Sequence, residues 1–171
     1  PVAFVAVGPG DVLDLGGYTV RVLAAAHDVG ADELTRDAVL YDVTGPDGRR
    51  LLYATDTGPL PDSVLAAVEG AAYDLVLLEE TFGRHIAHGT GHLDLATFPR
   101  ELARLRAAGA VTEQTDVVAV HLSHHNPPEL DRILAAWGAR TAPDLAEIVL
   151  GDATVRPAGL PRRTLLVGGA R

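Results

Sequence analysis

Four apolar stretches of the sequence each end at a residue that can bind a metal ion or carry a proton. The first stretch ends at His27, the second at Asp56, the third at Glu79 and Glu80, and the fourth at His121. In open α/β sheets, ligands collect outside the carboxyl ends of the strands. We therefore expect these side chains to meet at one edge of a sheet. Imidazole and carboxylate groups without any thiolate suit zinc, manganese or iron.

A second group of histidines lies in the glycine-rich segment 81–97. It contains His85, His88 and His92, and the last of these stands just before a predicted helix that Asp94 can cap. A histidine held in a fixed direction beside a metal site is a candidate general acid, and a nearby glutamate would tune it. His85 and His88 also fit a solvated loop without a function, and this alternative stays open.

The composition limits the class of protein. Of 171 residues, 47% are hydrophobic and 22% charged, which is typical of a soluble globular domain. The absence of cysteine excludes disulfides and thiolate metal sites. A formal net charge of −9 makes nucleic acid an unlikely partner. No apolar run is long enough for a membrane span and no signal peptide is visible, so we expect a cytoplasmic protein.

The pattern of apolar runs and turn residues predicts a β-rich first half followed by alternating strands and helices. Such an order indicates an α/β layered domain. The glycine pair at 16–17 predicts a tight hairpin between two of the strands. The predicted strands are 2–7, 12–15, 18–26, 38–43, 50–55, 75–80, 117–120, 147–151, 153–157 and 164–169, and the predicted helices are 61–71, 95–108 and 127–137.

The sequence resembles the metallo-β-lactamase superfamily in the order of its motifs. These are a strand followed by His27, then YATDTG, LLEETFG, HLDLAT and VVAVHLSHHN. More narrowly, the order is similar to the branch that holds ribonuclease Z and the carbon–phosphorus lyase pathway phosphodiesterase. The resemblance implies a four-layer αββα sandwich with a two-metal site between its sheets, which would hold two zinc or manganese ions in a complete domain.

The resemblance also implies a role for individual residues. His27 would bind the first metal, Asp56 would bridge both metals, and His121 would bind the second metal. His92 would protonate the leaving oxygen, and Glu79 would orient that histidine. By its own sequence context, Asp56 could instead cap the turn that follows its strand.

Two features of the chain ends lead to expectations about domain organisation. The family signature HxHxDH is not found in the sequence, so residues 1–156 are expected to be the C-terminal part of a metallo-β-lactamase-like domain that lacks the N-terminal part of the fold. Residues 157–163 are expected to be a linker. Residues 164–171 end in GGAR and resemble the first strand and phosphate loop of adenosylcobinamide kinase/guanylyltransferase, which indicates an actinobacterial fusion.

The expected function is metal-dependent hydrolysis of a small phosphate ester, most simply a phosphodiester, with a link to cobalamin biosynthesis. No membrane contact is expected, and a homodimer stays open. One alternative is that the parent protein is an adenosylcobinamide kinase/guanylyltransferase and that this segment is a non-catalytic accessory domain. Because the chain has no lysine, a phosphate loop cannot be completed within it.

Overall fold

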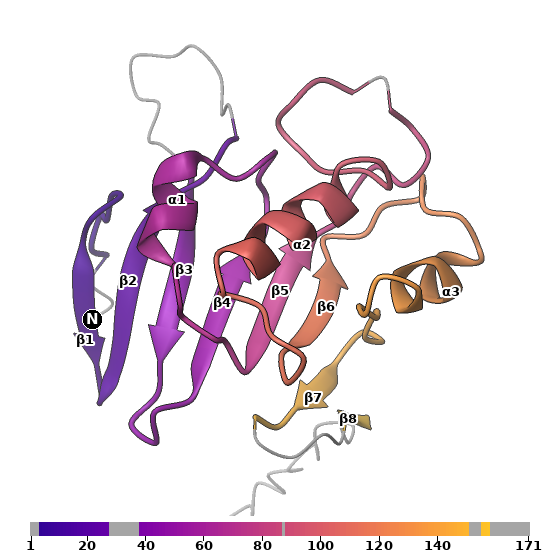
Figure 1. Cartoon of the computed structure of the whole chain (residues 1–171). Helices are drawn as coiled ribbons and strands as arrows, with labels where there is room; N and C mark the ends of the chain where they lie inside the picture. Colours follow the sequence, from indigo (N-terminus) through magenta and orange to yellow (C-terminus); the bar gives the residue numbers. More distant parts are fainter. Residues whose placement is uncertain (1–3, 28–37, 87, 151–154, 158–171) are drawn as a thin grey trace, which may run out of the picture.

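The computed structural model describes residues 4–27, 38–86, 88–150 and 155–157. Strands and helices alternate along the second half of the chain (Figure 1). The elements are β1 (Val12–Leu15), β2 (Tyr18–Ala24), β3 (Val39–Thr44), β4 (Arg50–Ala54), α1 (Asp62–Ala67), β5 (Leu75–Glu79), α2 (Phe98–Ala107), β6 (Asp116–Val120), α3 (Leu130–Ala135), β7 (Ala146–Ile148) and β8 (Val155–Pro157).

A six-stranded sheet with the order β1-β2-β3-β4-β5-β6 forms the centre of the molecule. The pairs from β1 to β4 are antiparallel, whereas β4, β5 and β6 are parallel neighbours. The β1–β2 hairpin turns at Gly16 and Gly17, whose φ angles of 64° and 90° are readily adopted only by glycine. Strands β2, β4, β5 and β6 therefore all run in the same direction, because β3 is antiparallel to both of its neighbours.

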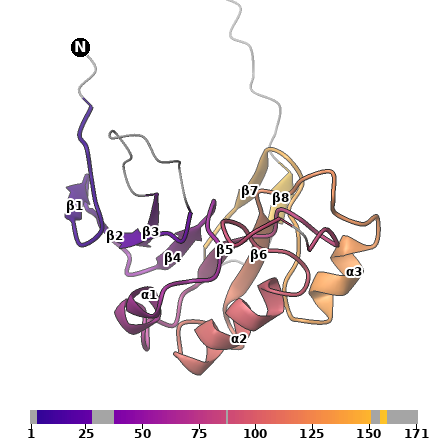
Figure 2. The same ribbon diagram turned by 90° about the horizontal axis from the view of Figure 1, so that it is seen from above.

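Helices α1 and α2 lie on the same face of this sheet (Figure 2). Each connects two neighbouring parallel strands, and right-handed crossovers in the same sense place their helices on one face. Two rows of side chains cross the sheet beneath them, one through Leu52 and Val76 and the other through Ala54 and Leu78. These side chains and Phe98, Leu102 and Leu105 of α2 form the core.

A buried carboxylate fastens α1 to the sheet. Asp42 is 1% exposed and accepts hydrogen bonds from Arg21 at 2.7 Å and Arg50 at 3.3 Å. The same two guanidinium groups donate to the carbonyl oxygens of Ala67 and Ala71, each at 3.0 Å. Ala67 is the last residue of α1, so Arg21 satisfies an acceptor that the helix itself cannot, and Arg50 binds the turn that follows.

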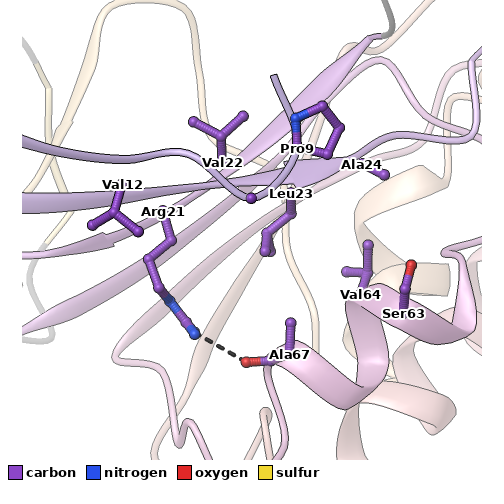
Figure 3. A pocket seen from close by; sticks show the side chains of 10 residues that line it. Pro9, Val12, Arg21, Val22, Leu23, Ala24, Ser63, Val64 and Ala67 are labelled. Carbon is purple, nitrogen blue, oxygen red and sulfur yellow. Dashed lines mark hydrogen bonds between the residues drawn. The ribbon is translucent and has the colours of Figure 1, made fainter. Parts of the chain in front are cut away.

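A cavity of about 370 Å³ lies between the β1–β2 hairpin and α1 (Figure 3). Its lining is apolar apart from Ser63 and Arg21, and Arg21 is already paired with Asp42. The cavity therefore offers no free charged group for chemistry.

The predicted α/β class is confirmed, and several boundaries differ. Residues 4–7 of the strand predicted at 2–7 are not a strand. The helix predicted at 61–71 ends at Ala67, since Gly70 with φ of 67° turns the chain. The helix predicted at 127–137 begins only at Leu130. Within the described residues the second sheet has two strands, β7 and β8.

The expected linker at 157–163, except for Pro157 in β8, and the strand expected at 164–169 lie outside the described residues. No helix in the described part of the chain has the length and apolar character needed to cross a membrane.

Removing side-chain volume at the centre of the sheet should destabilise the fold. Leu52 is 0% exposed in β4, so Leu52→Ala is expected to lower the free energy of unfolding by about 2–5 kcal/mol. Leu15→Ala is the matched control, because Leu15 is 58% exposed on the edge strand, and its effect should stay within about 0.5 kcal/mol. Urea denaturation measures both, and equal losses would contradict the described core.

Candidate metal centre and proton-transfer site

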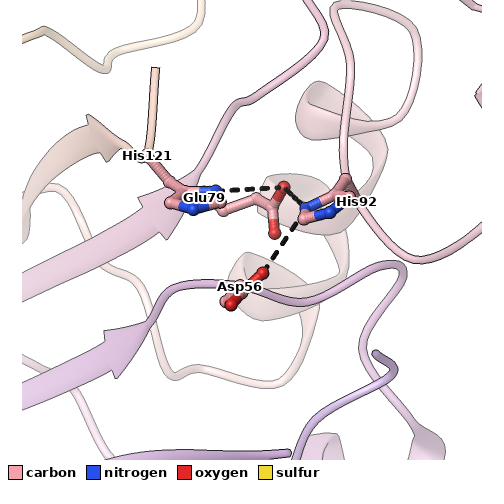
Figure 4. A group of neighbouring side chains, drawn as sticks. All are labelled: Asp56, Glu79, His92 and His121. Atoms are coloured by element: carbon pink, nitrogen blue, oxygen red, sulfur yellow. Dashed lines mark hydrogen bonds and ion pairs between the residues drawn. The ribbon is translucent and has the colours of Figure 1, made fainter. Parts of the chain in front are cut away.

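The common direction of four strands brings their terminal side chains to one edge of the sheet. His27 follows β2, Asp56 follows β4, Glu79 ends β5 and His121 follows β6. Figure 4 shows Asp56, Glu79 and His121 together with His92, which comes from the loop after β5. One potential ligand atom from each of these four residues lies within 4.8 Å of the others. The predicted convergence at the carboxyl ends of the strands is thus present for Asp56, Glu79 and His121, whereas His27 lies outside this group and approaches it at Asp56, with 3.6 Å between His27 Nε2 and Asp56 Oδ1.

The backbone turns sharply at two of these positions. Asp56 and His121 both have a φ of 58°, in the left-handed region that residues other than glycine seldom adopt. His121 directly follows the last residue of β6, and Asp56 is the second residue after the end of β4. The turn therefore lies where each strand ends, at the edge of the sheet. Such conformations cost about 1–3 kcal/mol each and concentrate at functional sites.

Glu79 is the centre of the hydrogen-bond network. Its side chain is 0% exposed. Its Oε1 accepts from the Thr81 hydroxyl at 2.6 Å, from His92 Nδ1 at 2.8 Å and from the Leu93 amide at 3.2 Å. Its Oε2 accepts from the Thr57 amide. The two backbone amides can only donate, so Glu79 is an acceptor in this network, and its four hydrogen bonds leave it little lone-pair capacity for a cation.

His92 is held by this carboxylate in one orientation. Since Glu79 accepts at Nδ1, that nitrogen carries a proton and Nε2 is the atom through which His92 can exchange protons. The same Nδ1 lies 3.7 Å from Asp56 Oδ1, and the His92 ring lies edge-on to His27 with the ring centres 4.7 Å apart. His92 thus stands beside the potential ligands without depending on them for its orientation.

His27 has a fixed tautomer as well. Its Nδ1 lies 2.9 Å from the carbonyl oxygen of Gly91, and a carbonyl can only accept, so Nδ1 carries the proton. The other nitrogen, Nε2, lies 3.6 Å from Asp56 Oδ1. Carbonyl oxygens that accept from the second ring nitrogen orient metal-binding histidines in many proteins. A hollow of about 520 Å³ lined in part by His27, Pro59 and Thr90 opens beside this imidazole.

The donor set fits a divalent cation. Two ligand atoms about 2.0–2.1 Å from a tetrahedral zinc ion lie about 3.3 Å apart, close to the 3.6 Å between His27 Nε2 and Asp56 Oδ1. The Asp56 side chain is 50% exposed and the His121 side chain 42% exposed, so both can adjust to an ion. Glu79 belongs to the same cluster by distance, but its hydrogen bonds make it an orienting group instead of a ligand.

Two threonines of the site were missed by the sequence reasoning. The Thr57 amide donates to Glu79, and its hydroxyl accepts from the Ala26 amide at 2.9 Å. The Thr81 hydroxyl lies between Glu79 and His121 Nδ1, 2.6 Å from the first and 2.8 Å from the second. Both follow charged residues of the quoted motifs directly, in TDTG and EETFG, and that position is the signal by which they could have been found.

The remaining histidines form an outer cluster, which consists of His85, His88 and His125 around Phe82 together with His124, which contacts His125. Phe82 also lies edge-on to His92, with the ring centres 5.4 Å apart, so it stands between this cluster and the site. The centre of the His125 ring lies 4.0 Å from that of His124 and 4.9 Å from that of His85. Burial and the neighbouring imidazoles lower the pKa of His125. His88 is only 4% exposed and is stacked on Phe82, so the solvated-loop interpretation is wrong for His88, whereas His85 is exposed.

Asp94 caps a turn ahead of the predicted helix. Its Oδ1 accepts from the amides of Ala96 and Thr97 at 2.8 and 2.7 Å, and α2 begins at Phe98. Its Oδ2 also lies 3.0 Å from His88 Nε2. These hydrogen bonds lower the pKa of Asp94 against the opposing effect of burial. Asp94 therefore has a structural role, as the sequence suggested.

The loop after β5 and the loop after β6 pack closely against each other. The Ser123 hydroxyl and the Asn126 amide donate to the Thr81 carbonyl. Glu80 is 0% exposed, accepts from the Gly83 amide at 3.0 Å, and burial raises its pKa to about 7. A side chain on Gly83 would meet the His125 carbonyl oxygen at 2.3 Å. This packing holds Thr81 against His121.

Comparison with known protein families gives one match. The family model described as "Beta-lactamase superfamily domain" matches residues 1–142. No curated protein matches the chain in sequence.

Several solved structures share the fold. The metallo-beta-lactamase fold protein YhfI from Bacillus subtilis is 18% identical, with a TM-score of 0.57 over 81% of this chain and 52% of its own. An isothiocyanate hydrolase from Delia radicum gut bacteria is 18% identical, with a TM-score of 0.57 over 78% and 55%. Unliganded yeast PDE1 is 14% identical, with a TM-score of 0.56 over 80% and 47%. The chain spans about half the length of these three proteins.

Two glycine substitutions separate backbone strain from crowding in the packed loops. Gly83 and Gly89 have φ angles of 52° and 79°, but only Gly83 has neighbouring backbone where a Cβ would lie. Gly83→Ala is expected to cost about 1–3 kcal/mol more than Gly89→Ala, because overpacking adds to the left-handed penalty. Thermal unfolding of both variants measures the difference. Equal destabilisation would show that the two loops do not touch as described.

Proposed function

The chain belongs to the beta-lactamase superfamily, and on this basis we propose that it is a metal-dependent hydrolase that acts on small phosphate esters, phosphodiesters first among them. The observation that carries the proposal is the meeting of Asp56 and His121 beside the His92–Glu79 pair, with His27 Nε2 lying 3.6 Å from Asp56 Oδ1. This arrangement combines potential ligands for a divalent cation with an oriented imidazole that can transfer a proton.

We assign the cation to His27, Asp56 and His121. Nitrogen and oxygen ligands without sulfur suit zinc or manganese, and the complete centre of the proposed branch would hold two such ions. When bound, the metal supplies Lewis-acid polarisation of the phosphoryl group and a nucleophilic hydroxide at neutral pH. Asp56, one of whose oxygens lies 3.6 Å from His27 Nε2, would provide carboxylate oxygens to both ions, as the resemblance implies.

His92 is the proposed general acid. Nδ1 keeps its proton and its hydrogen bond to Glu79 throughout. The protonated Nε2 donates its proton to the leaving-group oxygen as the bond between phosphorus and that oxygen breaks. The buried Glu79 carboxylate stabilises the imidazolium before transfer and orients the ring throughout. Glu79 acts through His92 and is therefore a positioning residue.

A small substrate suits the charge of the chain better than nucleic acid does. The net charge is −9, and Arg84 in the loop after β5 is already paired with Glu129. The resemblance to the ribonuclease Z and carbon–phosphorus lyase phosphodiesterase branch supports a phosphate ester. The terminal GGAR segment, which lies outside the described residues, suggests corrinoid and nucleotide phosphates as the first esters to test.

Metal binding should depend on His121 and not on its neighbour in the same loop. His121→Ala removes a proposed ligand and is expected to weaken zinc or manganese binding at least about 100-fold, since even outer-sphere partners contribute 10–100-fold. His124→Ala is the matched control, because His124 belongs to the outer cluster. Elemental analysis and chelator competition measure the affinity.

Turnover of bis-p-nitrophenyl phosphate should follow the metal content of these variants. Equal metal binding by His121→Ala and the unmodified protein would contradict the ligand assignment. Absence of both metal and turnover in the unmodified protein would favour the accessory-domain alternative.

The role of His92 can be tested with leaving groups of different basicity. An alkoxide must be protonated as it leaves, whereas p-nitrophenolate leaves readily without a proton. His92→Gln is therefore expected to lower kcat/KM about 10²- to 10⁴-fold for an alkyl phosphodiester and much less for bis-p-nitrophenyl phosphate. His125→Gln in the outer cluster serves as the control. An equal loss on both substrates would rule out His92 as the acid.

A further inference from the structure

We propose that Thr81 is a positioning residue of the metal centre, which fixes His121 in the tautomer that carries its proton on Nδ1 and presents a bare Nε2 to the cation. This inference deepens the proposed function and rests on it for its consequence in metal binding. The tautomer itself follows from contacts within the protein alone. The Thr81 side chain lies between the carboxylate that orients His92 and the imidazole of His121.

The direction of each hydrogen bond follows from the number of protons available. The Thr81 hydroxyl has one proton and three possible acceptors: Glu79 Oε1 at 2.6 Å, His121 Nδ1 at 2.8 Å and the His121 carbonyl at 3.1 Å. Donation to His121 would leave a carboxylate oxygen and a hydroxyl oxygen facing each other at 2.6 Å with no proton between them. The hydroxyl therefore donates to Glu79, which is the shortest contact and the charge-assisted one.

The proton on His121 then follows. With its own proton committed to Glu79, Thr81 presents only lone pairs to the imidazole. A contact of 2.8 Å between this oxygen and Nδ1 is favourable only if Nδ1 carries a proton. Within the described part of the chain no hydrogen bond reaches Nε2 of His121, and the side chain is 42% exposed, so this nitrogen is free to bind a ligand.

A chain of hydrogen bonds connects the imidazoles of His121 and His92 through the Glu79 carboxylate. His121 Nδ1 donates to Thr81, Thr81 donates to Glu79, and His92 Nδ1 donates to the same Glu79 oxygen. The two rings face each other at 5.6 Å with an angle of 19° between their planes. Both imidazoles thereby have Nδ1 protonated and Nε2 unoccupied, which is the state needed for a ligand in one case and for a proton carrier in the other.

The first test measures the tautomer in the metal-free protein by 15N NMR of the histidine rings, at about pH 8.5, where a free imidazole is neutral. We expect the proton of His121 on Nδ1. Thr81→Val removes the hydroxyl at nearly constant volume and should move the proton towards Nε2, whereas Thr81→Ser should keep the original tautomer. Thr44→Val, at the far end of β3, is the control and should change nothing.

This measurement needs no variant to overturn the inference. A proton found on Nε2 of His121 in the unmodified protein refutes it, and so does an unchanged tautomer in a folded Thr81→Val variant. If Thr81→Val fails to fold, the unmodified protein and Thr81→Ser still decide, because both must show the Nδ1 proton.

The second test measures metal affinity by competition with a chelator. Loss of the orienting partner is expected to weaken zinc binding 10–100-fold in Thr81→Val and to leave Thr81→Ser close to the unmodified protein. Equal affinities of all three would refute the positioning role. If the unmodified protein binds no metal while its tautomer is as expected, the proposed function fails and the assignment of the His121 proton stands.

Discussion

The candidate site depends on one buried interaction, the acceptance of four hydrogen bonds by the Glu79 carboxylate. A carboxylate with no exposed surface is stable only if donors replace its lost hydration. Here two backbone amides, the Thr81 hydroxyl and His92 provide them. Because these donors come from the loop after β4 and from both ends of the loop that joins β5 to α2, the same carboxylate that orients the site also holds these two loops together.

The sheet provides the geometry that this carboxylate needs. Strands β2, β4, β5 and β6 share one direction, so the residues that follow them meet at one edge although they are far apart in sequence. Asp56 and His121, where the chain leaves β4 and β6, both have left-handed backbone. Such conformations persist only where the surrounding structure holds them, and here the strands that precede both residues are part of the packed core.

The loops after β5 and β6 divide the histidines into two environments. His92 and His121 lie near the Glu79 carboxylate, while His85, His88 and His125 gather around Phe82 and His124 contacts His125. Close packing of Gly83 against the His125 backbone keeps the loops in register. Proximity in sequence therefore does not predict which group a histidine belongs to, because His121 and His124 are only three residues apart and belong to different groups.

The sequence by itself determined the α/β class, the central strands and the residue types at the strand ends, because apolar runs bounded by turn residues and charged groups are local patterns. It also indicated the family through the order of those motifs. It missed the start of α2 at Phe98, because a turn held by the Asp94 side chain comes first. It also missed the absence of a strand at residues 4–7, which pair with no strand in the described part of the chain and leave Phe4 96% exposed. Only the tertiary structure decided which nitrogen of each imidazole is free and which carboxylate is saturated with donors. Those properties depend on contacts such as that of Thr81 with His121, between segments forty residues apart, which no local pattern encodes.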